Sequence, residues 1–360
     1  MKNKKGNIKA VNQDFIKYDQ VEKTQVYNLS EIEGEDEFDE DYIIKTVDMS
    51  GFLSGDPEKV ATFSQELGEA MENIGFVILT GHGIDPDVFS KTRAKIIEFF
   101  EDITEEERLP YKAKRYGSVN QGYFPINETT IIHPDLVKGW VFCRRAFNFE
   151  NNPDFNEKEY WPRTGYEPFF RELCKAKESI ILPIMQGILQ YLKCDPHSYD
   201  KKLTHTNFGF RLNYYPALDD DYKSKGAGRM LGHEDVDLFT ILPSEDLDGL
   251  QALNRENMKW VRVNAPKGSI VINTGDYMQR ITNNRLPSTT HRVSAPKEVS
   301  KNNKTRVSFP MAVYVWEDEI LNVLPELDNP IYDPISALEF HTKITSKYYG
   351  DDYAVNTDDE

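Results

Sequence analysis

The ten residues HEDVDLFTIL, from His233 to Leu242, decide the fold. From Asp237 onward they form a short apolar run without Gly or Pro, which is typical of a buried β-strand. Similar runs lie on both sides along the chain, separated by Gly, Pro, Asn and Asp clusters that favour turns. These runs are Phe208–Tyr215, Lys259–Val263, Ser269–Asn273, His291–Val293 and Arg306–Val315. Short strands with regular turn signals predict a sandwich or jelly roll over residues 205–316.

Residues 46–204 carry helical signals. Asp56 and Pro57 suit an N-cap and a first helical position, and Gly75 ends the apolar period that follows. The other predicted elements are a buried strand at Phe76–Leu79, a helix at Pro86–Phe100, a helix opened by the capping box Thr104–Glu107, loops and short strands at Asn120–Asn148, and a long helix at Tyr166–Leu192 bent at Pro183. This part of the chain is therefore predicted to be mainly helical.

The two ends of the chain look different from its middle. Residues 1–45 lack a sustained apolar period and include the acidic run 31–41, so we expect an irregular arm there. Residues 317–360 predict a helix capped by Ser336 and then an acidic tail from Asp351. Together with the helical part (46–204) and the jelly-roll core (205–316), these segments make an α+β fold.

The composition excludes several functions. The net charge of the 360 residues is −17, which disfavours nucleic acid and anionic membrane surfaces as partners. Three cysteines without a CxxC pair argue against a disulfide framework or a thiolate zinc site. We see no secretory signal and no apolar run of the roughly 20 residues that span a bilayer. A cytoplasmic location is therefore expected.

A metal site is predicted by three residues. His233 and Asp235 are two residues apart, so in an extended strand their side chains point to one face. His291 begins another predicted strand 56 residues after Asp235. Two imidazoles and one carboxylate on a β scaffold make up a facial triad, which leaves positions on Fe(II) open for substrate and oxygen. His233, Asp235 and His291 are thus the candidate iron ligands.

Two further pairs have the same spacing. Arg306 and Ser308 place a guanidinium and a hydroxyl on one face of a strand, where they can bind a carboxylate. Asn213 and Tyr215 form a third pair upstream. Three such pairs on neighbouring predicted strands indicate one cavity lined by a barrel.

The remaining histidines are weaker candidates. His133 and Asp135 form a second His-x-Asp, but the proline between them disfavours a paired central strand. His82 belongs to a Gly-His-Gly turn, where a structural role is expected. The other three have no partner that the sequence reveals: His197, His205 and His341.

From residue 46 to residue 316 the sequence resembles the Fe(II)/2-oxoglutarate-dependent oxygenases, in the branch that includes isopenicillin N synthase and the plant hydroxylases. The shared elements are IGFVILTGHG (74–83), QGY (121–123), LNYYP (212–216), GHED (232–235), GLQ (249–251), GD (275–276), TNN (282–284), HRV (291–293) and RVS (306–308). Any one of these motifs is weak evidence of kinship, but the combination is specific.

The resemblance implies a distorted double-stranded β-helix, which is a jelly roll, flanked by N-terminal helices. It implies that Arg306 and Ser308 hold the distal carboxylate of 2-oxoglutarate, supported by Tyr215 and Asn213. It also implies Fe(II) as cofactor, with 2-oxoglutarate and O2 as co-substrates. The reaction would oxidise a C–H bond while 2-oxoglutarate is converted to succinate and CO2.

One spacing departs from this family. Arg306 follows His291 by 15 residues, which is a longer gap than usual. The intervening residues 294–305 are rich in Lys, Asn and Ser, so we expect a lengthened surface hairpin. The rival motif Arg292-Val-Ser294 adjoins the ligand His291 and is too close to hold the far end of the co-substrate.

Strand alternation predicts one substrate contact. If Asn213 and Tyr215 face the cavity, Arg211 faces it as well. An inward arginine needs a partner, which is either a substrate carboxylate or an internal acidic residue. Both alternatives stay open at this point.

Three other residues are candidate substrate contacts. Arg144 and Arg145 lie where this branch often places substrate-facing residues, although alternation lets at most one of them point inward. Tyr123 is the third, with aromatic packing as its alternative role.

The sequence thus predicts a monomeric or weakly associating oxygenase of secondary metabolism that hydroxylates a small, carboxylate-bearing metabolite. The first alternative is an Fe(II) oxidase or cyclase of the isopenicillin N synthase type, which needs no 2-oxoglutarate. The others are a non-catalytic jelly-roll binding protein and a demethylase acting on a basic protein segment.

Overall fold

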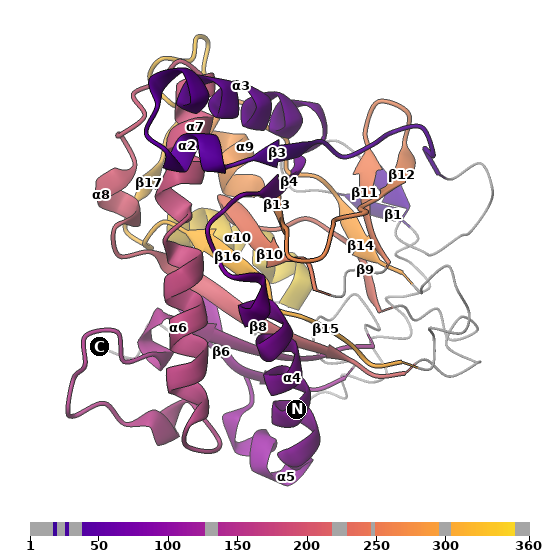
Figure 1. The fold of residues 1–360 in the computed structure, drawn as a ribbon, viewed down its shortest axis with the longest axis vertical. Coiled ribbons are helices and arrows are strands. Elements are labelled where there is room, and N and C mark those ends of the chain that lie inside the picture. The colour runs from indigo at the N-terminus through magenta and orange to yellow at the C-terminus, as the bar shows by residue number, and fades with distance from the viewer. Residues whose placement is uncertain are drawn as a thin grey trace.

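Two β-sheets pack face to face, and most helices lie outside the larger one (Figure 1). The computed structural model describes residues 17–19, 26–28, 38–126, 136–217, 229–245, 249–294 and 304–349. Within these ranges the helices are α2 (Ser50–Leu53), α3 (Pro57–Ile74), α4 (Pro86–Asp102), α5 (Glu105–Arg108), α6 (Tyr166–Glu178), α7 (Ile181–Tyr191), α8 (Asp200–Leu203), α9 (Asp276–Ile281) and α10 (Ala337–Tyr349).

The strands of the N-terminal half are β1 (Lys17–Asp19), β2 (Val26–Asn28), β3 (Thr46–Asp48), β4 (Phe76–Thr80), β5 (Lys114–Tyr116), β6 (Val119–Phe124) and β7 (Lys138–Cys143). Those that follow are β8 (Asn207–Tyr215), β9 (Met230–His233), β10 (Phe239–Pro243), β11 (Leu250–Asn254), β12 (Lys259–Arg262), β13 (Ile270–Thr274), β14 (His291–Val293), β15 (Arg306–Ser308), β16 (Met311–Tyr314), β17 (Ile320–Leu321) and β18 (Ile335–Ser336).

The large sheet runs in the order β3-β4-β13-β10-β16-β8-β7-β6-β5, and β15 also pairs with β8. The small sheet runs β12-β11-β14-β9. Strands β3 to β7 come from the part predicted to be mainly helical, so the large sheet extends across the predicted boundary at residue 205. The predicted jelly roll with flanking helices is confirmed.

Two apolar clusters hold these layers together. One fills the space between the large sheet and the N-terminal helices, and the other lies between the two sheets. Strand β4 contributes to both, because Phe76 and Ile78 face the small sheet while Val77 and Leu79 face the helices. A strand that is buried on both faces has a continuous apolar sequence, which is why β4 could be predicted from the sequence.

Helix α3 matches its predicted start and end. The Asp56 carboxylate accepts hydrogen bonds from the backbone N–H groups of Glu58 and Lys59. Gly75 ends the helix with φ = +70°, in the left-handed region. A Cβ there would lie 2.5 Å from the carbonyl oxygen of Pro287, so both the backbone angle and the space require glycine.

The long helix predicted for residues 166–192 is wrong in one respect, because it is two helices rather than one bent helix. Helix α6 ends at Glu178 and α7 begins at Ile181. Pro183 has no N–H to bond the carbonyl of Ser179, and its ring clashes with that carbonyl. The interruption therefore lies one turn before the proline.

Proline also divides the last predicted strand. The run 306–315 forms β15 and β16 in one continuous register against β8, separated by Phe309 and Pro310. Pro310 has no N–H for the ladder, although its carbonyl oxygen accepts a hydrogen bond from the Arg211 N–H.

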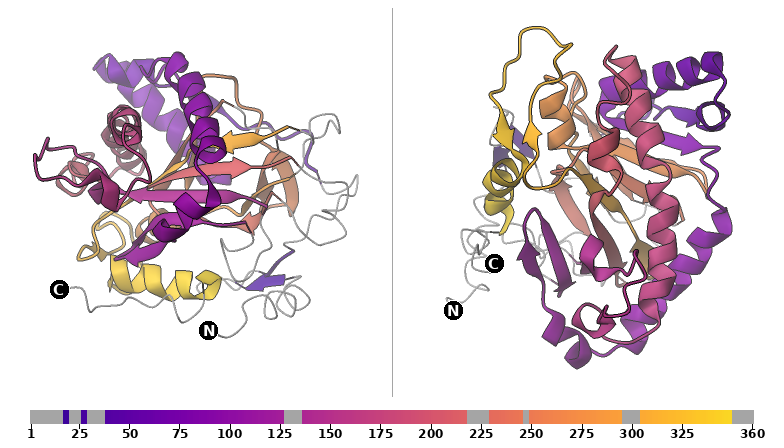
Figure 2. Two further views of the ribbon diagram at one scale, coloured as in Figure 1. Left: turned by 90° about the horizontal axis from the view of Figure 1, so that it is seen from below. Right: turned by 90° about the vertical axis from the view of Figure 1, so that its left-hand side faces the viewer.

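Helix α10 lies on the far side of the strands from helices α3 and α4 (Figure 2). Its N-terminal turn is capped by Ser336, whose hydroxyl accepts a hydrogen bond from the Glu339 N–H at 3.1 Å. No helix among the described residues is long and apolar enough to cross a membrane. Several predictions fall outside the described residues: most of the arm, the His133-x-Asp135 motif, most of the hairpin after Ser294, and the acidic tail.

Candidate active site

The two candidate histidines meet because their strands pair. His233 ends β9, His291 begins β14, and the two residues are direct cross-strand partners in the small sheet. Their ring centroids lie 4.3 Å apart. Side chains of such a pair share one face of the sheet, so both imidazoles point into the space between the sheets.

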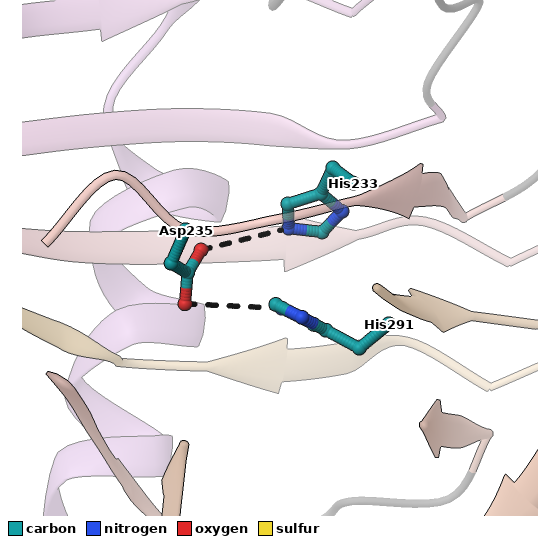
Figure 3. A group of neighbouring side chains, drawn as sticks. All are labelled: His233, Asp235 and His291. Carbon is teal, nitrogen blue, oxygen red and sulfur yellow. Dashed lines mark ion pairs between the residues drawn. The ribbon is translucent and has the colours of Figure 1, made fainter. Parts of the chain in front are cut away.

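Asp235 joins them from just beyond the end of β9, not from within a strand as predicted. Its Oδ1 lies 3.8 Å from His233 Nε2, and its Oδ2 lies 3.8 Å from His291 Nε2 (Figure 3). One ligand atom from each residue falls within 4.8 Å of the others. The three side chains therefore converge on one position, at which they can hold a single metal ion.

Neighbouring groups select which atoms face that ion. His291 Nδ1 donates to the carbonyl oxygen of Thr289 at 3.0 Å, so the Nε2 lone pair is left for a metal. Oδ2 of Asp235 accepts hydrogen bonds from Asn273 Nδ2 at 2.8 Å and Thr240 Oγ1 at 2.7 Å. The donor set of two neutral imidazoles and one carboxylate fits Fe(II).

The Asp235 carboxylate is held in its charged form. Burial acts to raise its pKa, but the electrostatic interaction with the His291 and His233 rings and the two hydrogen bonds to Oδ2 outweigh this, so the pKa lies below its usual value. Asp237 behaves in the opposite way, because burial and the Asp235 charge hold its pKa well above the usual range.

Thr240 connects these two carboxyl groups. Its hydroxyl oxygen lies 2.7 Å from Oδ2 of Asp235 and 2.7 Å from Oδ2 of Asp237. A hydroxyl carries one proton and can donate to only one of them. With Asp237 protonated, its carboxyl group would donate to the Thr240 oxygen, and the Thr240 proton would be left for Asp235.

The two predicted polar pairs turn out to be cross-strand partners. Arg306 of β15 lies opposite Tyr215 of β8, and Ser308 lies opposite Asn213. The Arg306 guanidinium carbon stands 4.7 Å from the centre of the Tyr215 ring. Asn213 Nδ2 donates to Ser308 Oγ at 3.2 Å. The structure therefore gathers these four residues in one patch, as the sequence predicted.

This patch and the triad line one cavity of about 220 Å³ between the two sheets. The histidines approach it from the small sheet, and the Arg306 patch approaches it from the large sheet. A diacid can thus be held by its far carboxylate at Arg306 and Ser308 while its other end faces the triad.

Arg211 lines the same cavity, as strand alternation predicted. Its Nε donates to Asn213 Oδ1 at 2.7 Å, and its guanidinium carbon lies 5.6 Å from the centre of the Phe124 ring. No carboxylate among the described residues forms an ion pair with it. The internal ion pair considered as an alternative is therefore not found in this part of the chain.

The other three substrate candidates do not line this cavity. Tyr123 is buried on the opposite face of β6, where its hydroxyl donates to the Glu105 carboxylate. Arg144 pairs with Glu178, and Arg145 stacks on the Tyr116 ring at 4.7 Å. Strand alternation does not apply to Arg144 and Arg145, because β7 ends at Cys143 and a 3₁₀ turn follows.

The structural role expected for His82 and the rejection of the Arg292-Val-Ser294 motif both agree with the geometry. His82 Nε2 donates to the carbonyl oxygen of Gly268 at 2.9 Å, and its Nδ1 accepts a hydrogen bond from the Ile84 N–H. Arg292 points away from the cavity, stacks on Trp260 at 4.0 Å and donates to Gln251.

Several cavity residues were missed by the sequence reasoning. Asn120 lies in a segment read as loops and short strands, and Tyr314 lies past the last recognised motif. His341 and Thr345 reach the cavity from α10. Their spacing of four residues places them on one helix face, but nothing in the sequence says what that face covers.

Comparisons with known proteins agree with this geometry. Residues 206–313 match the family model of the 2OG-Fe(II) oxygenase superfamily, and residues 44–164 match that of the N-terminal region of non-haem dioxygenases in morphine synthesis. A bifunctional coumaroyl CoA and feruloyl CoA ortho-hydroxylase of Ipomoea batatas is 28% identical over 272 residues, which are 74% of this chain and 72% of that protein.

Solved structures show the same fold. A 2OG-Fe(II) oxygenase family protein from Caulobacter crescentus is 26% identical, with a TM-score of 0.70 over 84% of this chain and 98% of that one. A full-length Neurospora crassa protein, solved in complex with α-KG and thymine, is 21% identical, with a TM-score of 0.75 over 88% and 99%.

The chain therefore belongs to the Fe(II)/2-oxoglutarate-dependent oxygenases. It is a non-haem dioxygenase, an oxidoreductase that uses Fe(II), 2-oxoglutarate and O2. These findings fit the 2-oxoglutarate-dependent prediction and not the alternative of an oxidase that dispenses with the co-substrate.

Proposed function

We propose that this enzyme hydroxylates a C–H bond of a small, carboxylate-bearing metabolite while it converts 2-oxoglutarate to succinate and CO2. The observation that carries the substrate class is the position of Arg211, which lines the cavity of the triad without a carboxylate partner among the described residues. A cavity of about 220 Å³ that also accommodates 2-oxoglutarate favours a small substrate.

In this proposal each residue has a separate task. His233, Asp235 and His291 hold Fe(II), which supplies the oxygen chemistry when bound. Arg306 and Ser308 bind the distal carboxylate of 2-oxoglutarate. Tyr215 and Asn213 support them, the first under the guanidinium and the second through the Ser308 hydroxyl.

Further parts of the proposal concern the setting of the enzyme. We place it in secondary metabolism, which the match to dioxygenases in morphine synthesis and the similarity to a plant ortho-hydroxylase support. A cytoplasmic location and a monomeric or weakly associating state are proposals made from the sequence.

The experiment is an anaerobic reconstitution with Fe(II) and 2-oxoglutarate, followed by oxygen and a screen of small carboxylic acids. We expect oxygen uptake and succinate release only when 2-oxoglutarate is present. The His233→Ala variant should lose the weak visible band of the Fe(II)–2-oxoglutarate chelate. His197→Ala, which changes an exposed histidine, should keep it. Oxygen uptake independent of 2-oxoglutarate would contradict the proposal.

The role of Arg211 has its own test. Arg211→Ala should raise the KM for the primary substrate by at least about tenfold, because the contact with the substrate carboxylate is lost. The KM for the co-substrate should rise by less, since Arg306 and Ser308 are unchanged. An unchanged substrate KM would rule out this role.

A further inference from the structure

Two buried polar atoms on the large sheet stand out in the active-site cavity. They are Nη2 of Arg211 and Oδ1 of Asn120, and neither has a hydrogen-bond partner among the described residues. Both residues line the cavity. A buried polar atom without a partner costs about 1–3 kcal/mol, so each atom marks a place where a ligand can supply the missing partner.

The Arg211 guanidinium is fixed in position by its surroundings. Its Nε is bound to Asn213, and its plane lies over Gly139 of the neighbouring strand β7. A Cβ on Gly139 would come within 3.1 Å of Nη2. The absence of a side chain at position 139 therefore lets the guanidinium lie flat on the sheet, beside the Phe124 ring.

Asn120 lies further along the same sheet. Strand pairing places Gly139 opposite Phe124 on β6, and Asn120 is four residues before Phe124. Strand geometry then separates the Cα atoms of Gly139 and Asn120 by roughly 14 Å. A ligand that reaches both atoms therefore carries its polar groups at opposite ends, not on adjacent atoms.

The two atoms have opposite polarity. Nη2 is a donor and requires an acceptor, for which a carboxylate is the best match. Oδ1 is an acceptor and requires an N–H or O–H group. The wall between the two positions is apolar and includes Val141. A ligand that satisfies both atoms therefore has an acidic end, an apolar middle and a donor end.

We propose that Asn120 and Arg211 together select a small acid that carries an amino, amide or hydroxyl donor at the end opposite its carboxylate. This inference rests on the proposed function and specifies its substrate class. Arg211 binds the carboxylate, and Asn120 distinguishes donor-bearing acids from acids that lack the donor.

The test measures binding calorimetrically, without oxygen, to the full chain loaded with Fe(II) and 2-oxoglutarate. The probes are ω-amino acids from glycine to 6-aminohexanoate and the matching acids without the amino group. The wild-type protein should bind at least one ω-amino acid at least about tenfold more tightly than its partner acid. Equal binding within every pair, or no binding at all, would overturn the proposal.

Substitutions assign the selectivity to Asn120. Asn120→Leu should abolish the difference within the pair, whereas Asn120→Asp keeps an acceptor and should retain it. If Asn120→Asp loses the difference as fully as Asn120→Leu, the residue does not accept a hydrogen bond and the proposal is wrong. Asn257→Leu, at an exposed turn, is the matched control and should bind like the wild type.

A second variant separates the two ends of the ligand. Gly139→Ala should displace the guanidinium and weaken both members of a pair by the same factor, while their ratio stays constant. A change in the ratio would contradict the separate roles assigned to Arg211 and Asn120. The visible band of the Fe(II)–2-oxoglutarate chelate is the reference, because its absence from the wild type would mean that the proposed function itself has failed.

Discussion

At the scale of single residues, the orientation of the triad depends on groups that are not ligands. Thr240 and Asn273 are cross-strand partners on β10 and β13, and both bond Oδ2 of Asp235. They fix the carboxylate so that Oδ1 stays available. Such supporting contacts are the usual means by which a protein sets the geometry and affinity of a metal site.

Removing one of these contacts gives the first prediction. Asn273→Ala should weaken Fe(II) binding roughly 10- to 100-fold, because the Asp235 carboxylate can then rotate. Anaerobic Fe(II) titration, followed by the visible band in the presence of 2-oxoglutarate, measures this affinity. Asn257→Ala is the control, and equal Fe(II) affinity in the two variants would show that Asn273 does not orient the carboxylate.

At the scale of elements, local signals set the ends of helices and strands. The N-cap of α3 illustrates this, since the Asp56 side chain satisfies two backbone N–H groups that have no partner within the helix. The helix packs against α7 and β4, so the position of its first turn also affects how the helical layer covers the large sheet.

The cap gives the second prediction. Asp56→Ala should lower the free energy of unfolding by about 1 kcal/mol, because two N–H groups lose their acceptor. Asp56→Asn retains an acceptor oxygen and should keep most of the stability. Urea denaturation of both variants measures the effect, and equal losses in the two would indicate that the side-chain cap is not the cause.

At the scale of the whole molecule, α10 closes the cavity with residues from the far end of the chain. His341 is buried there, with its Nδ1 3.2 Å from the Tyr277 hydroxyl. Burial, together with the positive charge of Arg115, lowers the pKa of His341 to about 3. The imidazole is therefore neutral in the folded protein at ordinary pH.

This pKa predicts how stability depends on pH. Between pH 6.5 and pH 3 the unfolded chain binds a proton at His341 that the folded chain does not, so His341 makes stability fall as the pH decreases. His341→Gln should be less stable at pH 7, where it lacks the imidazole contacts. On acidification the free energy of unfolding should fall less in this variant than in the wild type. The difference should be about 1 kcal/mol for each pH unit below about 6.5.

Urea midpoints of the metal-free protein at about pH 7, 6 and 5 measure this difference. His197→Gln, which changes an exposed histidine, is the control and should follow the wild-type curve. Parallel curves for the wild type and His341→Gln would show that His341 does not titrate in this way.

The sequence by itself determined whatever depends on neighbours along the chain. Spacing of two residues placed Asn213 with Tyr215, and Arg306 with Ser308, each pair on one face, because alternation is a property of the strand. Caps and prolines also act on nearby residues of the chain, so they set the ends of helices. Pro183 interrupts the helix one turn before the proline itself, which is earlier than expected.

Only the tertiary structure decided which strands meet and what each surface covers. The pairing of β9 with β14 brings His233 to His291, and the pairing of β8 with β15 brings Asn213 to Ser308. Alternation puts Tyr123 and Asn120 on opposite faces of β6, but only the packing of the sheets decided that the Asn120 face lines the cavity. Such contacts join residues far apart in the chain, so they follow from packing and register, which no local pattern encodes.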